Sequence, residues 1–225
     1  MLTAILALAA ATLAAPAGAR VARIPATQEL VVLLRAHPAR FAPSVHSRQL
    51  VLVPALTPIT EGRTVLPVLA RRGIWLKVRL PGRPNVHSGW IDRAFTSSAS
   101  TPWRIVVDRG RRRVTVYRSG RRVRWFAAVV GKPSTPTPGG EFFVEESVAL
   151  RSSDVGAPFA LALSARSNVL QEFEGGPGQI ALHGLANVGG VPGTAVSHGC
   201  IRLPSAAMRW LAARIAPGTP VTIFG

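Results

Sequence analysis

Proline and glycine divide this chain into short apolar segments. The 225 residues include 21 Gly and 19 Pro. One segment alternates regularly, with apolar side chains at Ile74, Leu76, Val78 and Leu80. A period of two residues is typical of a strand with one buried face. Further runs of this kind, spaced by turn residues, predict a mainly β fold.

The first residues have a different composition. Leu2 to Ala15 are apolar and are followed by Ala17-Gly18-Ala19. A short apolar run before an Ala-x-Ala site is typical of a secretory signal peptide, which predicts residues 1–19 as the signal and cleavage after Ala19. No Lys or Arg precedes the run, so a retained membrane anchor stays open as an alternative. We expect export to the periplasm or cell wall, with no stable membrane span after signal removal.

The charge balance favours an anionic partner. Lys and Arg number 27 against 10 Asp and Glu, a formal net charge of +17. In an exported protein such a charge predicts contact with an anionic cell envelope. Nine arginines lie between Arg104 and Arg124. They lack interleaved stacking aromatics, which favours the solvated side of a half-buried hairpin over a phosphate-binding stripe. We therefore predict no nucleic-acid partner.

A Ser/Thr-rich segment divides the mature chain. Residues 96–102 are predicted as a linker between a small β-barrel at 26–95 and a second domain at 103–225. The pair of segments Trp75–Asn85 and Gly89–Ile91 resembles the bacterial Src-homology-3-like domains attached to exported wall enzymes. Within 26–95 nothing has a catalytic pattern. Its isolated histidines are expected at the surface: His37, His46 and His87.

The second part has clearer local signals. Ser119-Gly120 predicts a hairpin turn between two strands. The proline-rich segment 131–140 predicts a rigid turn between a strand ending at Val130 and one beginning near Glu141. Pro204 suits the first position of a helix whose face carries Met208, Leu211, Ala212 and Ile215. A last strand is expected at 221–224.

The only cysteine, Cys200, lies in the stretch "SHGCIRL". Thiol acyl transfer needs an imidazole to take the thiol proton and backbone N–H groups aimed at the developing oxyanion. His183 and His198 are candidate bases, and Gly199 supplies backbone freedom before the thiol. A lone exported thiol is otherwise an oxidation liability. The pattern therefore predicts a nucleophile.

Three other interpretations stay open. Cys200 could be a buried structural residue, or it could join His183 and His198 as three zinc ligands, although no fourth ligand stands at a standard spacing. It could also belong to an NlpC-type cysteine peptidase. In that family the cysteine precedes its histidine, whereas no histidine follows Cys200 here.

The residues 103–225 resemble the YkuD-type L,D-transpeptidases. The features that carry the resemblance are "LHG", a Gly-rich loop, "SHGCIRL", the "GKPSTPTPGGEF" turn and the terminal "PGTPVTIF". His183 and Cys200 are separated by 17 positions, as in that family. The resemblance implies a β-sandwich-like catalytic domain with a C-terminal helix. It also implies a thioester mechanism without a cofactor or metal.

The resemblance also implies roles for individual residues. Cys200 would be the nucleophile, His183 its general base, and the Gly184 carbonyl the group that orients His183. The backbone N–H groups of Gly199 and Cys200 would form the oxyanion hole, and His198 would shape the site. Substrate binding would fall to two residues, Ser197 and Arg202; Arg202 would either hold the loop or meet a substrate carboxylate.

The implied reaction uses peptidoglycan stem peptides. The Cys200 thiolate would release the terminal D-alanine of a tetrapeptide stem, and an amine of a neighbouring stem would take the acyl group. A carbapenem would trap the same thiol. An L,D-carboxypeptidase that hydrolyses the thioester is one alternative, and a non-catalytic peptidoglycan-binding protein is another. The segment before His183, which should cover the substrate, yields no assigned binding residue.

Overall fold

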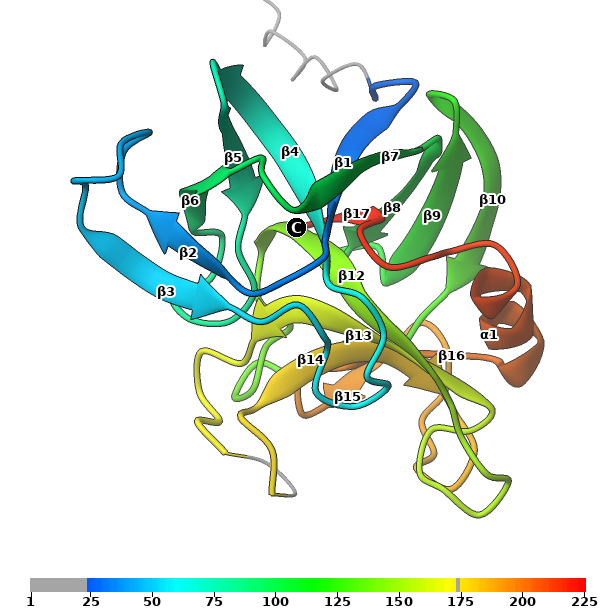
Figure 1. The fold of residues 1–225 in the computed structure, drawn as a ribbon. Coiled ribbons are helices and arrows are strands. Elements are labelled where there is room, and N and C mark those ends of the chain that lie inside the picture. The colour runs from blue at the N-terminus through cyan, green and yellow to red at the C-terminus, as the bar shows by residue number, and fades with distance from the viewer. Residues whose placement is uncertain (1–23, 173–174) are drawn as a thin grey trace, which may run out of the picture.

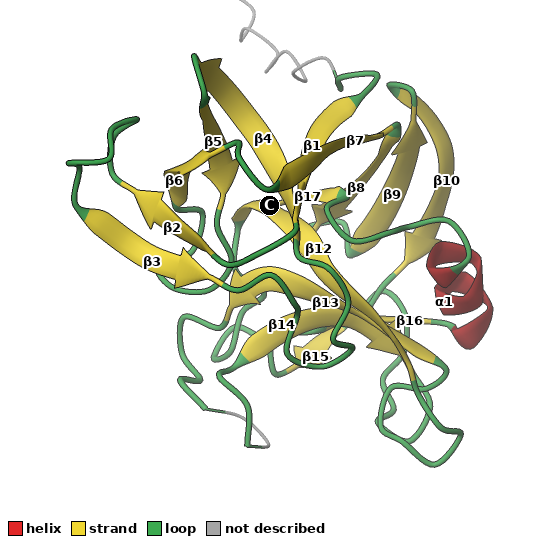
Figure 2. Cartoon of the chain, in the orientation of Figure 1, coloured by secondary structure: helices red, strands yellow, loops and turns green. Residues whose placement is uncertain are grey.

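The computed structural model describes residues 24–172 and 175–225, so the predicted signal peptide at 1–19 lies outside them. The described chain forms a seven-stranded sheet, an eight-stranded sheet, a two-stranded sheet and one helix (Figures 1 and 2). The mainly β prediction is confirmed. Within these described ranges no helix combines the length and the apolar character that crossing a membrane requires.

The first sheet has the strand order β3-β2-β6-β5-β4-β1-β7. Its strands are β1 (Gln28–Leu33), β2 (His37–Arg40), β3 (Gln49–Val53), β4 (Val65–Arg72), β5 (Trp75–Arg79), β6 (Ser88–Asp92) and β7 (Thr96–Thr101). The predicted alternation holds in β5 and beyond, because Leu76, Val78 and Leu80 are buried, whereas Ile74 lies in the preceding turn and is exposed. The likeness to Src-homology-3 domains stays a prediction.

The segment predicted as a linker is a strand for most of its length. Residues Thr96–Thr101 form β7 and pair antiparallel with all six residues of β1. Ser and Thr mark an irregular segment only when the backbone has no partner, and here an edge strand takes them with most side chains partly or fully exposed. The segment still connects the two large sheets through Pro102. The proposed division into domains remains a prediction.

The second sheet has the order β10-β9-β8-β17-β12-β13-β14-β16. Its strands are β8 (Trp103–Asp108), β9 (Arg113–Arg118), β10 (Arg121–Ala127), β12 (Gly140–Ala149), β13 (Phe159–Arg166), β14 (Gln179–Gly184), β16 (Ile201–Leu203) and β17 (Pro220–Phe224). Val129, just beyond β10, pairs with Arg202 of β16 through two backbone hydrogen bonds of 2.9 Å. This pairing joins the two edges, so the predicted sandwich is better described as a nearly closed barrel.

The local predictions for this part are largely confirmed. Ser119 and Gly120 both have positive φ, 50° and 76°, as the tight turn of the β9–β10 hairpin requires. The proline-rich turn runs from β11 (Val130–Gly131), which pairs with β15 (Ala195–Ser197), to β12. Helix α1 (Ser205–Ala212) begins one residue later than predicted, because Pro204 has extended dihedral angles and occupies the N-cap.

Side chains of both parts meet at the junction of the two sheets. Phe143 of β12 belongs to the apolar core of the first sheet. The buried carboxylate of Glu146 accepts hydrogen bonds from the N–H groups of Ile59 and Thr60 and from the Thr60 hydroxyl, the last two at 2.7 and 2.8 Å. The predicted surface position of His37 is wrong. Its ring is buried, and both nitrogens contact backbone carbonyls, because the turns on either side fold over it.

Candidate active site

His183 lies on β14, and a neighbouring carbonyl fixes its ring. Its Nδ1 lies 2.8 Å from the carbonyl oxygen of Gly184. A carbonyl oxygen only accepts hydrogen bonds, so Nδ1 carries the proton and Nε2 of the neutral ring is left as an acceptor. Burial lowers the pKa of His183 below its ordinary value, the Gly184 carbonyl opposes that shift, and the nearby Arg202 cation adds to it. The site therefore favours a neutral imidazole.

Cys200 lies just before β16, which runs parallel to β14. The register pairs Leu182 with Ile201 and His183 with Arg202. Leu182 and Ile201 both point into the core. Side chains alternate between faces within a strand, so His183 lies on the face of β14 opposite to Leu182. Continuing the register by one residue places Cys200 beside Ala181, two positions from His183. Cys200 is half-buried, and its Sγ contacts the Gln179 carbonyl at 4.0 Å.

The turn that presents Cys200 is held by hydrogen bonds within itself. Gly199 adopts φ of 126°, a conformation that L side chains rarely adopt. The Ser197 hydroxyl donates to the Cys200 carbonyl at 2.6 Å and accepts from the Gly199 N–H at 3.1 Å. Ser197 is fully buried, so its observed partners belong to the turn, whereas we expected a substrate contact. The predicted oxyanion donor of Gly199 is occupied by this hydroxyl.

The predicted proline-rich turn packs against the turn of residues 197–200, which we call the nucleophile turn. Thr137 Oγ1 donates to the Gly199 carbonyl at 2.7 Å, and Thr135 Oγ1 donates to the Ser197 carbonyl at 3.2 Å. Both threonines are buried. Sequence reasoning identified the turn but not these contacts, because nothing local indicates which loop a threonine will meet.

A second missed residue, Gly156, lies against the imidazole. A Cβ atom at Gly156 would stand 2.5 Å from His183 Nδ1, and the residue has φ of 84°. Its carbonyl accepts a hydrogen bond from the Gly184 N–H at 2.6 Å. The segment before His183 thus forms one wall of the site through Gly156. A glycine there is the only available signal, since the contact is distant in sequence.

Arg202 is directed toward the loop that follows His183. Its Nη1 donates to the carbonyls of Val188 and Gly189 at 3.3 and 3.2 Å. Of the two roles expected for Arg202, these contacts favour holding the loop. Its buried Nε has no hydrogen-bond partner among the described residues.

His198 is exposed at the turn. Among residues 24–172 and 175–225, no three or more His, Cys, Asp and Glu side chains gather closely enough to hold a metal ion. The three zinc ligands considered from the sequence, His183, His198 and Cys200, therefore do not form such a group in the structure.

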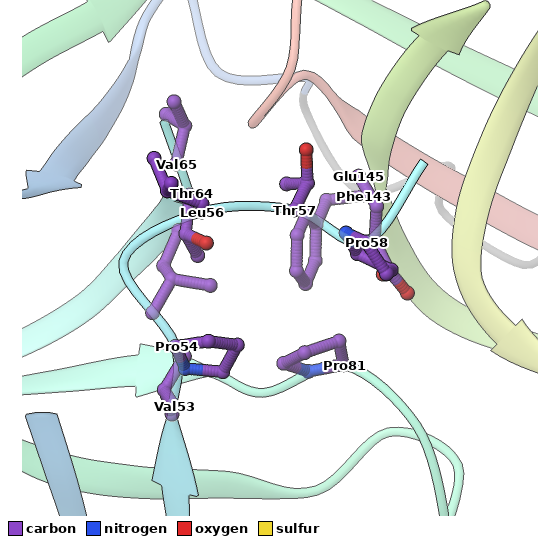
Figure 3. A pocket seen from close by; sticks show the side chains of 11 residues that line it. Val53, Pro54, Leu56, Thr57, Pro58, Thr64, Val65, Pro81, Phe143 and Glu145 are labelled. Carbon is purple, nitrogen blue, oxygen red and sulfur yellow. The ribbon is translucent and has the colours of Figure 1, made fainter. Parts of the chain in front are cut away.

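An apolar pocket lies elsewhere, at the junction of the two sheets (Figure 3). Residues from the β3–β4 connection line it together with Phe143 and Glu145 of β12. Burial raises the pKa of Glu145, and the neighbouring Arg166 guanidinium, 2.9 Å away, opposes that shift. The lining includes neither His183 nor Cys200, so this pocket is separate from the candidate active site.

The fold does supply the arginines with aromatic partners. Trp210 of α1 packs edge-on against Trp103 and Phe126, with ring centroids 6.1 and 5.8 Å apart. Arg124 and Arg214 lie over the Trp210 ring at 5.4 and 4.6 Å. We call these five residues the arginine–aromatic cluster. Neither arginine forms an ion pair with any described Asp or Glu.

A fold of this kind, with a histidine on β14 and a half-buried cysteine just before the neighbouring β16, agrees with the family comparison. The family model for the YkuD L,D-transpeptidase catalytic domain matches residues 102–223. The chain therefore belongs to the YkuD family and is an L,D-transpeptidase.

Individual relatives carry the same names. The protein named putative L,D-transpeptidase YkuD of Bacillus licheniformis is 33% identical over 175 residues, which are 73% of this chain and 96% of that one. L,D-transpeptidase 1 of Mycobacterium tuberculosis is 32% identical over 123 residues, 49% of this chain and 46% of that one. The solved L,D-transpeptidase 3 of Mycobacterium tuberculosis, in complex with a faropenem-derived adduct, aligns with a TM-score of 0.47 at 14% identity, covering 72% of this chain and 91% of that one.

Proposed function

We propose that this L,D-transpeptidase is an exported cysteine acyltransferase that cross-links peptidoglycan stems, with Cys200 as nucleophile and His183 as general base. The observation that carries the proposal is the hydrogen bond from His183 Nδ1 to the Gly184 carbonyl. It leaves Nε2 as the proton acceptor on β14, which pairs with the strand that directly follows the only thiol of the chain. A base oriented by a third group is what an activated nucleophile requires.

The first half-reaction forms a thioester. His183 Nε2 takes the Cys200 proton, and Sγ attacks the carbonyl carbon of the amide after the third stem residue. The carbonyl π electrons move to oxygen, where the backbone N–H of Cys200 stabilises the charge. When the intermediate collapses, the C–N bond breaks and His183 returns its proton to the departing nitrogen. D-Alanine leaves, and the acyl group stays on sulfur.

The second half-reaction transfers the acyl group. An amine of a neighbouring stem attacks the thioester carbon and gives a proton to His183. The C–S bond then breaks, and the thiolate is regenerated with the new amide released. Two half-reactions through one covalent intermediate imply ping-pong kinetics. The lowered pKa of His183 supports this cycle, because the imidazole is neutral near pH 7 and ready to accept.

The proposal includes an anionic envelope as the setting of the reaction. Residues 109–140 and 175–225 contain no Asp or Glu, and the arginine–aromatic cluster is formed by residues adjoining or within those stretches. Arg214 donates from Nη1 to the Trp210 carbonyl at 3.1 Å. A guanidinium that lies over a ring has further N–H groups that can meet a carboxylate or phosphate. The cluster therefore offers a surface for the wall outside the active site.

The test is covalent trapping. The full chain, reduced and shown to be folded, is incubated with a carbapenem, and its intact mass is taken beside that of Cys200→Ala. We expect one adduct per wild-type chain and none on the variant. Purified tetrapeptide stems then separate transfer from hydrolysis, because transfer yields a cross-linked dimer. Absence of an adduct on folded, reduced wild type contradicts the proposal.

A further inference from the structure

Thr137 occupies the space between the proline-rich turn and the nucleophile turn. Its side chain is buried, with 1% exposed. The hydroxyl accepts from the Gly131 N–H at 2.9 Å and donates to the Gly199 carbonyl at 2.7 Å. An N–H only donates and a carbonyl only accepts, so these two partners fix the direction of the hydroxyl proton.

The hydrogen bond from Thr137 to the Gly199 carbonyl orients the whole peptide unit between Gly199 and Cys200. The Gly199 carbonyl and the Cys200 N–H belong to the same peptide unit, which is planar and trans, so they point in opposite directions. Holding the carbonyl toward Thr137 therefore aims the Cys200 N–H away from Thr137. Glycine leaves this peptide unit unusually free to rotate, and Gly199 has φ of 126°. The bond from Thr137 adds a constraint from outside the turn to those that Ser197 supplies within it.

The Cys200 N–H is the donor for which this direction matters. Two N–H groups were expected at the oxyanion, but that of Gly199 donates to Ser197 Oγ at 3.1 Å. Oxyanion stabilisation requires a donor aimed in advance at the position where charge develops. Thr137 constrains the peptide unit that carries the second expected donor, the Cys200 N–H.

Thr137 is itself held firmly. The Arg109 guanidinium donates to its backbone carbonyl at 2.7 Å. The backbone of the turn passes so close to Gly131 that a Cβ atom there would stand 2.4 Å from the Thr137 nitrogen. A β-branched side chain also has few rotamers. The hydroxyl therefore has little freedom to leave its position.

We propose that Thr137 is a positioning residue that aims the Cys200 N–H at the oxyanion of the acylation step. The inference deepens the proposed function and rests on it, since it assumes an acylatable Cys200. It assigns to the "TPTP" segment a part in catalysis beyond that of a rigid connection.

The experiment compares two reactions of the same thiol. Acylation by a carbapenem passes through an oxyanion, whereas alkylation by iodoacetamide displaces iodide at a saturated carbon and needs no oxyanion hole. Both rates are measured by intact mass on the full chain for wild type, Thr137→Val and Thr137→Ser. The matched control is Thr219→Val, a fully buried threonine whose hydroxyl donates to the Ala216 carbonyl, also at 2.7 Å.

We expect Thr137→Val to slow acylation about 10- to 100-fold, which is less than the outright loss of an oxyanion donor would cause. Alkylation should stay within about twofold of wild type, because it needs no oxyanion hole. Thr137→Ser, which keeps the hydroxyl, should recover most of the acylation rate. Thr219→Val should change neither rate. Equal slowing of both reactions, or unchanged acylation in Thr137→Val, overturns the inference. Wild type that is alkylated but never acylated overturns the proposed function itself.

Discussion

Two regions of the molecule are held by different kinds of polar contact. At the junction of the sheets, the buried carboxylate of Glu146 accepts hydrogen bonds from Ile59 and Thr60. At the nucleophile turn the hydrogen bond joins two neutral groups, because the Thr137 hydroxyl donates to the Gly199 carbonyl. A buried carboxylate stripped of partners, or backbone donors stripped of a carboxylate, is far more costly than a lost neutral hydrogen bond. We therefore expect stability to depend more on the junction of the sheets and catalytic geometry more on the nucleophile turn.

Among substitutions at the active site, Gly156→Ala is expected to have the largest effect on the acylation rate. The new Cβ would stand 2.5 Å from His183 Nδ1, so the ring must move and its bond to the Gly184 carbonyl is lost. We expect carbapenem acylation to slow about 100-fold, as for a misplaced general base. The measurement is the adduct formation rate by intact mass.

The control for backbone strain is Gly73→Ala. Gly73 also has positive φ, 59°, but nothing lies within 4 Å of a Cβ there. Both substitutions should lower the free energy of unfolding by about 1 kcal/mol through the left-handed backbone. If Gly73→Ala slowed acylation as much as Gly156→Ala, contact with His183 would not be the cause.

A substitution at the junction of the sheets should lower stability and leave the acylation rate nearly unchanged. Glu146→Ala removes the acceptor of two backbone N–H groups and one hydroxyl in a buried place. We expect the free energy of unfolding to fall by about 2–3 kcal/mol, measured by urea denaturation. Acylation per folded molecule should stay within about threefold of wild type, because the oxyanion donors and the base are untouched.

Glu141→Ala is the matched acidic control. Its carboxylate is half exposed and lies 3.5 Å from Arg104. The Arg104 side chain is 14% exposed, and the Thr222 hydroxyl donates to the same carboxylate at 3.0 Å. A partly exposed ion pair of this kind contributes about 0–1 kcal/mol. A larger loss in Glu141→Ala than in Glu146→Ala would remove the distinction between the two regions.

The pH dependence of acylation provides a further test of the active site. Burial and Arg202 together hold the pKa of His183 below its ordinary value of 6.5, so the base stays neutral to lower pH than a free imidazole. Stability from this group is complete above pH 6.5 and is lost as pH falls through the folded-state pKa. Arg202→Gln should raise that pKa, shifting the acid limb of the acylation rate to higher pH, whereas Arg202→Lys should shift it less. An unchanged acid limb in Arg202→Gln would contradict the electrostatic account.

The smallest effect is expected outside both regions. Arg124→Gln removes a cation from the arginine–aromatic cluster. We expect cosedimentation with isolated peptidoglycan to weaken about threefold at low salt and less at high salt, since screening grows with ionic strength. The control, Arg48→Gln, removes an arginine that lies over Phe41 in the connection between β2 and β3. Equal weakening by both would assign the binding to net charge alone.

Local signals predicted much of the fold. The Ser119-Gly120 turn and the last strand were predicted where they occur, and the family was identified from the motif around Cys200. β7 was missed because Ser and Thr composition says nothing of backbone partners. Gly156 and Thr137 could not be assigned to the site, because each acts through a contact between segments far apart in sequence.

The joining of the sheet edges has a consequence for partial unfolding. β16 is three residues long, and it is held between β14 and the Val129 pairing. A strand held by few pairings can open locally at a lower free energy than the whole structure. Loss of the Val129–Arg202 pairing would free one side of β16, the strand that follows Cys200, while the first sheet stays intact. Amide hydrogen exchange at Arg202 should therefore be faster than in β12 or β13, and enzyme inactivation on heating should precede global melting.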